Sequence, residues 1–237
     1  MKILSQIIKL IYPLRCPVCG DYLKEEAMLC KRCLDGLKRL EPPFCSVCGV
    51  PFSGSGNSHL CEDCLRKRPV FSSIFSPYLY QDTAVIAVQL FKFQKKMLVG
   101  KTMGILLGRF ALNIWDKKEL KEHVIVPVPL GKRRLRQRGF NQSLVLARYV
   151  SKAIGLPLDY LSLRRIKETE PQSLLKKDKR KKNVKGAFQV LGDRLKRKNI
   201  ILVDDVVTTG STLNECALAL KRAGAKQIVC LVFARAK

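Results

Sequence analysis

One stretch of sequence decides the fold: Ile200-Ile201-Leu202-Val203-Asp204-Asp205-Val206-Val207-Thr208-Thr209-Gly210-Ser211-Thr212. An apolar strand delivers two carboxylates to its carboxyl end, where open α/β sheets bind ligands, and a turn of small residues then opens a helix. Backbone N–H groups at the turn, aided by hydroxyls and the helix N-terminus, can enclose a phosphate. Gly210 lets the backbone approach closely, and the adjacent acids can accept hydrogen bonds from vicinal sugar hydroxyls.

This stretch also allows two plainer interpretations. Asp and Thr before a helix are ordinary caps, and an apolar run ending in two acids also occurs on the magnesium-binding strand of nucleotide triphosphatases. The chain contains no G-x-x-x-x-G-K-[ST] sequence, so a triphosphate cradle is missing. Capping explains one hydroxyl residue, but not an acid pair followed by Thr-Thr-Gly-Ser-Thr.

The surrounding sequence alternates between strand and helix patterns. The expected strands are residues 70–80, 123–129, 199–203 and 227–233, and the expected helices are residues 83–94, 100–115, 141–154 and 211–223. Residues 164–186 are rich in lysine and arginine with few apolar anchors, which predicts a mobile loop. The alternation predicts the α/β class, with a parallel sheet flanked by helices.

Eight of the ten cysteines lie in the first 64 residues, as four C-x-x-C knuckles. Ten residues separate the first knuckle from the second, and twelve separate the third from the fourth. The cysteines of the four knuckles are Cys16, Cys19, Cys30, Cys33, Cys45, Cys48, Cys61 and Cys64. Two intervening residues let a tight turn aim both sulfurs at one ion, and two knuckles complete a tetrahedral shell. The pattern predicts two structural Zn²⁺ sites in a four-cysteine zinc-ribbon module.

The cysteines allow several alternative interpretations. Disulfides need an oxidising compartment, and a redox dithiol would not occur in four copies. The sequential pairing of knuckles is the simplest, but spacing alone leaves an interleaved one open, and His59 could compete as a ligand although a surface position is favoured. Cys216 and Cys230 lie in apolar helix and strand patterns and are interpreted as small buried residues.

Composition limits the partners. At 237 residues, with 45 Lys+Arg against 19 Asp+Glu and a formal net charge of +26, the chain favours polyanions. We expect two domains, residues 1–69 and 70–237.

Apolar residues at helical spacing in residues 3–11 predict a short amphipathic helix rather than a signal peptide. No transmembrane segment is predicted, and a cytoplasmic location is expected.

The acid pair and the Thr-Thr-Gly-x-Thr turn resemble the signature of type I phosphoribosyltransferases, which bind 5-phosphoribosyl-1-diphosphate (PRPP) with magnesium. The whole chain resembles more specifically the ComF/GntX family of competence-associated proteins. The motifs that carry this resemblance, after the cysteine knuckles, are Val126-Pro127-Val128-Pro129-Leu130, Arg138-Gly139-Phe140-Asn141-Gln142, Arg165, Thr169, Gln172, Arg180, Asn183 and Gly186-Ala187-Phe188.

The resemblance implies roles for individual residues. Asp204 and Asp205 would bind the ribose hydroxyls and, with Arg138, form the catalytic set, while Asn141 and Gln142 would line or brace the pocket. Segment 164–186 would close over the substrate, with Arg165, Thr169, Gln172 and Arg180 as its candidates. The residues expected to bind PRPP are Val128, Pro129, Leu130, Asp204, Asp205, Thr208, Thr209, Gly210, Ser211 and Thr212.

Two functions follow from these expectations. The first is binding of magnesium PRPP, in a protein of DNA uptake or utilisation, with transfer of phosphoribosyl to an unidentified nitrogen acceptor. The second is a non-catalytic competence factor that binds single-stranded DNA, alongside other DNA-processing proteins, and senses or holds a phosphate ligand. Residues 132–138 and 176–185 form basic clusters, with Phe140 and Phe188 available for stacking unless they belong to the core.

Overall fold

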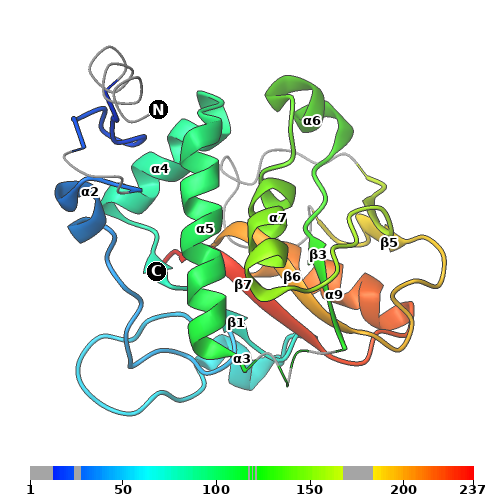
Figure 1. Cartoon of the computed structure of the whole chain (residues 1–237). Helices are drawn as coiled ribbons and strands as arrows, with labels where there is room; N and C mark the ends of the chain where they lie inside the picture. Colours follow the sequence, from blue (N-terminus) through cyan, green and yellow to red (C-terminus); the bar gives the residue numbers. More distant parts are fainter. Residues whose placement is uncertain (1–12, 24–27, 117, 119, 121, 168–183) are drawn as a thin grey trace.

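The central feature of the structure, a computed structural model, is a parallel β-sheet (Figure 1). The structure describes residues 13–23, 28–116, 118, 120, 122–167 and 184–237. Strand order is β1-β7-β6-β3, and β2 also pairs with β7. Their bounds are Ile74–Phe75 (β1), Tyr78–Leu79 (β2), His123–Pro127 (β3), Asn199–Val207 (β6) and Ile228–Arg235 (β7). The predicted α/β class is confirmed.

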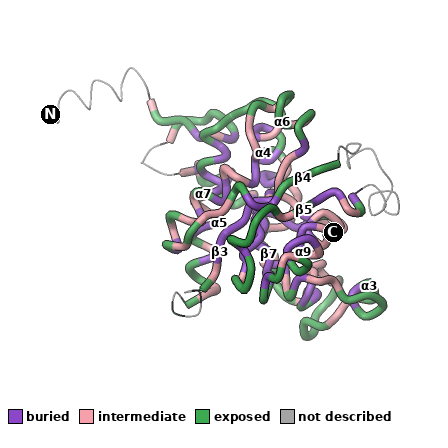
Figure 2. The backbone as a smooth tube through the Cα atoms, turned by 90° about the vertical axis from the view of Figure 1, so that its right-hand side faces the viewer, coloured by how far each residue is buried: buried purple, intermediate pink, exposed green. Residues whose placement is uncertain are grey.

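Helices cover both faces of the sheet, which explains why its strands are apolar without alternation. On β6, Ile201 and Val203 pack with residues of α4, α5 and α7, whereas Ile200 and Leu202 pack with α9. The tube in Figure 2 shows the strands as the buried centre of the molecule. The bounds of these helices are Asp82–Phe93 (α4), Met97–Ile114 (α5), Gln142–Ile154 (α7) and Ser211–Arg222 (α9).

Close helix packing depends on glycines of α5. A β-carbon at Gly104 would lie 2.7 Å from the ring of Tyr149 on α7, and one at Gly108 would lie 2.8 Å from Ala153. The two helices therefore lie side by side across the sheet (Figure 1). Within the described residues, α5 is long and apolar enough to cross a membrane, but half of it is buried inside the protein, as in the core helix of a globular domain.

Three sequence expectations need correction. Residues 70–80 form two short strands instead of one, because Ser76 and Pro77 interrupt the pairing with β7 and proline lacks an N–H. The strand expected at 123–129 ends at Pro127, and that expected at 199–203 continues to Val207, so the acid pair lies within β6.

The segment expected to be one loop, 164–186, begins in regular structure. Leu163–Arg165 (β4) pairs antiparallel with Phe188–Val190 (β5), which forms a separate two-stranded sheet beside the parallel one. Arg165 is therefore a strand residue. A further helix, Lys132–Arg138 (α6), was not predicted, because four arginines and a lysine in seven residues present no apolar stripe.

The cysteine knuckles pack on opposite faces of the sheet. Cys16 and Cys33, near the short helix Lys31–Asp35 (α2), belong to the core that contains α4 and α5. Cys45 and Cys64, near Glu62–Arg66 (α3), belong to the core that contains α9. The predicted boundary between residues 69 and 70 stays a prediction, and the helix expected at residues 3–11 lies outside the described residues.

Candidate functional site

A cavity of about 720 Å³ opens at the carboxyl ends of β3 and β6. Its lining brings together sequence motifs that are more than 60 residues apart, because both strands are parallel and adjacent. It includes every residue expected to bind PRPP, together with Arg138, Asn141, Gln142 and Arg165. Of the other loop candidates, Thr169, Gln172 and Arg180 lie outside the described residues.

The turn between β6 and α9 is shaped to accept an anion. Gly210 has φ 73°, a left-handed conformation that glycine adopts without a steric penalty, and it directs the chain into α9. The Thr209 and Ser211 hydroxyl oxygens lie 2.9 Å apart, and the Ser211 N–H is directed at Thr209 Oγ1 at 3.4 Å. Small polar groups and a helix N-terminus thus meet at one point of the cavity wall, an arrangement that can accept an anion.

The acid pair is held from two helices. The Ser143 hydroxyl on α7 donates to Asp204 Oδ1 at 2.7 Å, and Asp205 N–H donates to the same oxygen at 2.9 Å. Lys92 Nζ, from α4, lies 2.7 Å from Asp205 Oδ2, and the Asp205 side chain is only 7% exposed. Burial and the neighbouring Asp205 raise the pKa of Asp204 to about 7, although Ser143 and Lys92 act in the opposite direction. The Asp204 carboxyl group is therefore protonated in about half of the molecules near neutral pH.

The loop after β3 is fixed by the cap of α7. Asn141 Nδ2 donates to the Val128 carbonyl at 3.1 Å, and Asn141 Oδ1 accepts from Ser143 N–H as the N-cap of the helix. Asn141 thus braces Val128–Leu130 and positions Ser143 for Asp204. Within the described part of the chain, Gln142 Nε2 has no hydrogen-bond partner although the residue is 3% exposed.

Cations line much of the wall that faces the acid pair. The lining includes Lys95, the α6 residues Arg133, Arg134 and Arg138, and Arg165 of β4. Burial lowers the pKa of Arg138, and the charges of Asp205 and Asp204 oppose that effect. The guanidinium of Arg138 lies 5.3 Å from the centre of the Phe93 ring. The cavity is therefore suited to a ligand that carries more negative charge than one phosphate.

Sequence reasoning missed the wall contributed by α4. Gln89, Lys92 and Phe93 line the cavity, as does Tyr80 just before the helix. Their helical pattern was recognised, but nothing in the sequence indicated that Lys92 meets Asp205. Of the two phenylalanines considered for stacking, Phe188 is a core residue, 7% exposed and with Arg165 above its ring. Phe140 is partly buried and packs against the core, with its ring centre 5.1 Å from that of Phe91.

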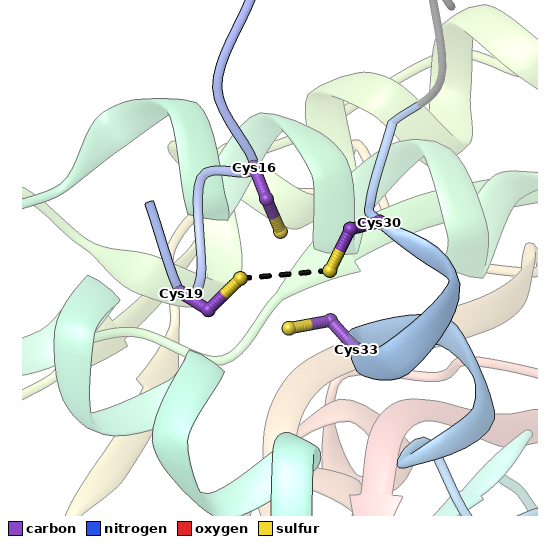
Figure 3. Close-up of side chains that lie close together, drawn as sticks. All are labelled: Cys16, Cys19, Cys30 and Cys33. Atoms are coloured by element: carbon purple, nitrogen blue, oxygen red, sulfur yellow. Dashed lines mark hydrogen bonds between the residues drawn. The ribbon is translucent and has the colours of Figure 1, made fainter. Parts of the chain in front are cut away.

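The eight cysteines form two four-sulfur clusters with the sequential pairing. Cys16, Cys19, Cys30 and Cys33 form one, and the other four knuckle cysteines form the second, with the sulfurs of each cluster within 4.8 Å of one another. Figure 3 shows the first cluster, in which the sulfurs of Cys19 and Cys30 are 3.5 Å apart. A tetrahedral Zn–S shell with bonds of about 2.3 Å has this size and leaves no position for water.

The second cluster also contains groups that favour a thiolate. Burial acts to raise the pKa of Cys45, but N–H groups of Cys48 and Cys61 outweigh burial and lower it to about 6. His59 belongs to neither cluster and stacks on Phe52 at 4.2 Å. Cys216 and Cys230 are both fully buried among apolar residues, as expected.

Comparison with known proteins agrees with this architecture. The family described as double zinc ribbon domain matches residues 7–65, and the phosphoribosyl transferase domain family matches residues 98–237. Competence protein F of Haemophilus influenzae is 32% identical over 211 residues, which cover 88% of this chain and 90% of that protein. The chain belongs to the ComF family.

Other ComF-family relatives have related names. The DNA utilization protein YhgH of Escherichia coli K12 is 34% identical, over 81% of this chain and 85% of that protein, and the competence protein ComFC of Bacillus subtilis is 30% identical, over 85% and 81%. Among solved structures, a purine phosphoribosyltransferase from Pyrococcus horikoshii matches with a TM-score of 0.33 and 24% identity, over 56% of this chain and 71% of that one. Neither family match includes residues 66–97, which contain α4 and its Lys92.

Proposed function

We propose that this ComF-family protein binds magnesium PRPP in the cavity and acts in the cytoplasm in DNA uptake or utilisation. The observation that carries the proposal is the meeting of the acid pair and the hydroxyl-lined turn on one cavity wall. Asp204 and Asp205 would accept hydrogen bonds from the ribose hydroxyls, and Thr208–Thr212 would enclose the 5-phosphate. The names of its relatives support the biological setting.

The diphosphate of PRPP would extend toward Val128–Leu130, within reach of Arg138. Magnesium would enter with the ligand, and the carboxylate oxygens of Asp204 and Asp205 are hard donors of the type that it prefers; bound, it would neutralise charge on the diphosphate. If transfer occurs, a nitrogen lone pair attacks C1 of the ribose as the bond from C1 to the diphosphate oxygen breaks. That electron pair leaves with pyrophosphate, whose charge the cationic wall would stabilise, and the nitrogen then loses a proton.

Calorimetric titration of magnesium PRPP tests the pocket. Wild-type protein should bind, and the variant Asp204→Asn/Asp205→Asn should lose binding because its amides replace two carboxylate acceptors. Asp193→Asn, an exposed acid on a loop remote from the cavity lining, is the matched control and should bind like the wild type. If zinc-replete wild-type protein does not bind, the PRPP proposal is wrong. Pyrophosphate release in the presence of candidate amines then tests for transfer.

Binding of single-stranded DNA is the second candidate function. One observation favours it: α6 presents exposed Lys132, Arg133 and Arg136 beside the cavity, and this helix has no buried residue. Such an exposed cationic helix can contact a polyanionic backbone. Affinity should fall with salt, with a log–log slope of roughly −0.7 for each phosphate contacted. Binding that does not respond to salt, or that Arg133→Gln/Arg136→Gln leaves unchanged, would contradict a role for α6.

A further inference from the structure

The turn at Thr208–Thr212, called the phosphate turn below, packs against the chain segment that follows the second cysteine cluster. Phe71 and Ile74 are buried, and a β-carbon placed on Gly210 would lie 3.9 Å from Phe71 and 4.0 Å from Ile74. Val70 N–H donates to Asn214 Oδ1 in the first turn of α9 at 2.8 Å. Ile74 N–H in turn donates to the carbonyl of Val47, which lies between two cysteine ligands, at 2.8 Å.

A single buried arginine joins the same two parts directly. Arg235, the last residue of β7, is 5% exposed. Its Nε donates to the Cys48 carbonyl at 2.9 Å, and its Nη1 donates to the carbonyls of Val207 at 3.3 Å, of Thr208, and of Ala236 at 2.8 Å. One guanidinium therefore bridges a cysteine knuckle and the beginning of the phosphate turn.

These bonds help to fix which way the turn presents its N–H groups. In a planar trans peptide the carbonyl and the following N–H point in opposite directions. Ala236 N–H also donates to the Val207 carbonyl, at 2.9 Å, whereas the side chain of Arg235 holds both the Val207 and the Thr208 carbonyls, so the N–H groups of Thr208 and Thr209 are directed away from Arg235. Only a planar guanidinium offers several donors in a fixed arrangement, and hydrogen bonds from a charged donor are the stronger kind.

We propose that Arg235 is a positioning residue that ties the second cysteine cluster to the phosphate turn, so that metal in that cluster and an anion in the cavity favour each other. The anion part rests on the proposed function. By thermodynamic reciprocity, the factor by which metal in the second cluster strengthens anion binding equals the factor by which the anion strengthens metal binding. Within the described residues, the hydrogen bond that Arg235 gives to a cysteine knuckle goes to the second cluster, and the first cluster packs on the other face of the sheet.

The first test compares Arg235→Gln and Arg235→Lys with Arg222→Gln, an exposed control on α9. Loss of the charge-assisted bonds to the Val207 and Thr208 carbonyls should weaken binding of magnesium PRPP by about tenfold or more. Hydrogen exchange of residues 208–212 should accelerate while exchange in the centre of β6 stays unchanged. Arg235→Lys keeps the positive charge but lacks the planar set of guanidinium donors. It should therefore show the same weaker binding and faster exchange, which keeps the test decisive even if Arg235→Gln folds poorly. The control should match the wild type.

The second test loads the full chain with cadmium-113 and records one resonance for each cluster. Ser46→Ala, a change between two ligands of the second cluster, assigns its resonance. Arg235→Lys should shift that resonance and leave the first unchanged, and magnesium PRPP should shift it in wild type but not in the variant. A role in stability alone would perturb both clusters and all amides together.

The outcomes separate this proposal from the proposed function. If wild-type protein does not bind magnesium PRPP, the proposed ligand is wrong, but hydrogen exchange and the ligand-free resonances still decide the role of Arg235. The positioning role is refuted if both Arg235 variants keep wild-type exchange at residues 208–212 and an unshifted second resonance. It is equally refuted if they bind magnesium PRPP as tightly as the wild type does.

Discussion

Asp204→Asn should stabilise the protein above neutral pH while it removes a binding group. The pKa of Asp204 is raised from 3.8 to about 7, first by burial and then by Asp205. A carboxyl group whose pKa is higher in the folded protein stabilises the fold fully at pH values below its pKa in the unfolded chain, 3.8 here. This stabilisation is lost as the pH rises through the folded-state pKa of about 7. In wild-type protein at pH 8 the site therefore holds a charge that folding disfavours, and asparagine removes it.

The magnitude follows from the shift. A change from 3.8 to about 7 corresponds to about 4 kcal/mol, which is a ceiling for the gain. Asparagine weakens the hydrogen bonds from Ser143 Oγ and Asp205 N–H, each of which contributes about 1 kcal/mol. We expect a net gain of about 1–2 kcal/mol at pH 8, which is about 2–8 °C in Tm for a chain of this length.

The assay is thermal and urea unfolding of zinc-replete wild type and Asp204→Asn from pH 5 to pH 8.5. The gain should shrink toward pH 5, where wild-type Asp204 is protonated. Asp159→Asn is the control of opposite sign: burial raises the pKa of Asp159, but bonds from Ser162 and Leu161 outweigh burial and lower it. It should destabilise by the same amount from pH 5 to pH 8.5, because a carboxyl group with a lowered pKa loses its contribution only as the pH falls below its ordinary value of 3.8. A gain for Asp204→Asn that does not depend on pH would refute the reasoning.

Three further predictions concern the same site. Gly210→Ala and Gly155→Ala each place a side chain at φ near +75° and should each lose about 1 kcal/mol of stability, but only Gly210→Ala should also weaken binding of magnesium PRPP in calorimetry. Lys92→Met leaves buried Asp205 without its cation and should lose about 2 kcal/mol in urea unfolding at pH 8, whereas the exposed control Lys101→Met should lose almost nothing; equal losses would contradict the ion pair. Cys45→Ser should reduce metal content from two zinc ions per chain to one, and retention of both would disprove the assigned second cluster.

Much of the fold was determined by local sequence. Apolar strands next to amphipathic helices gave the α/β class, because burial on both faces of a parallel sheet requires continuous apolar strands. Four C-x-x-C knuckles specified two clusters, because the chemistry of the ligand atoms and the reach of a tight turn are local. The Thr-Thr-Gly-Ser-Thr turn and its acid pair were identified in the same way, since neighbours in sequence create that site.

Only the tertiary structure decided which residues distant in sequence complete the site around the acid pair. Lys92 meets Asp205 and Ser143 meets Asp204 because α4 and α7 pack across the ends of particular strands, and helical periodicity does not encode that choice. The sequential cluster pairing and the opposite placement of the clusters likewise depend on how the chain crosses the sheet. Arg235 is one basic residue among 45 in sequence, and only the adjacency of β7 and β6 and the position of Cys48 join it to the phosphate turn. Local patterns specify elements and donor types, whereas long-range packing selects their partners.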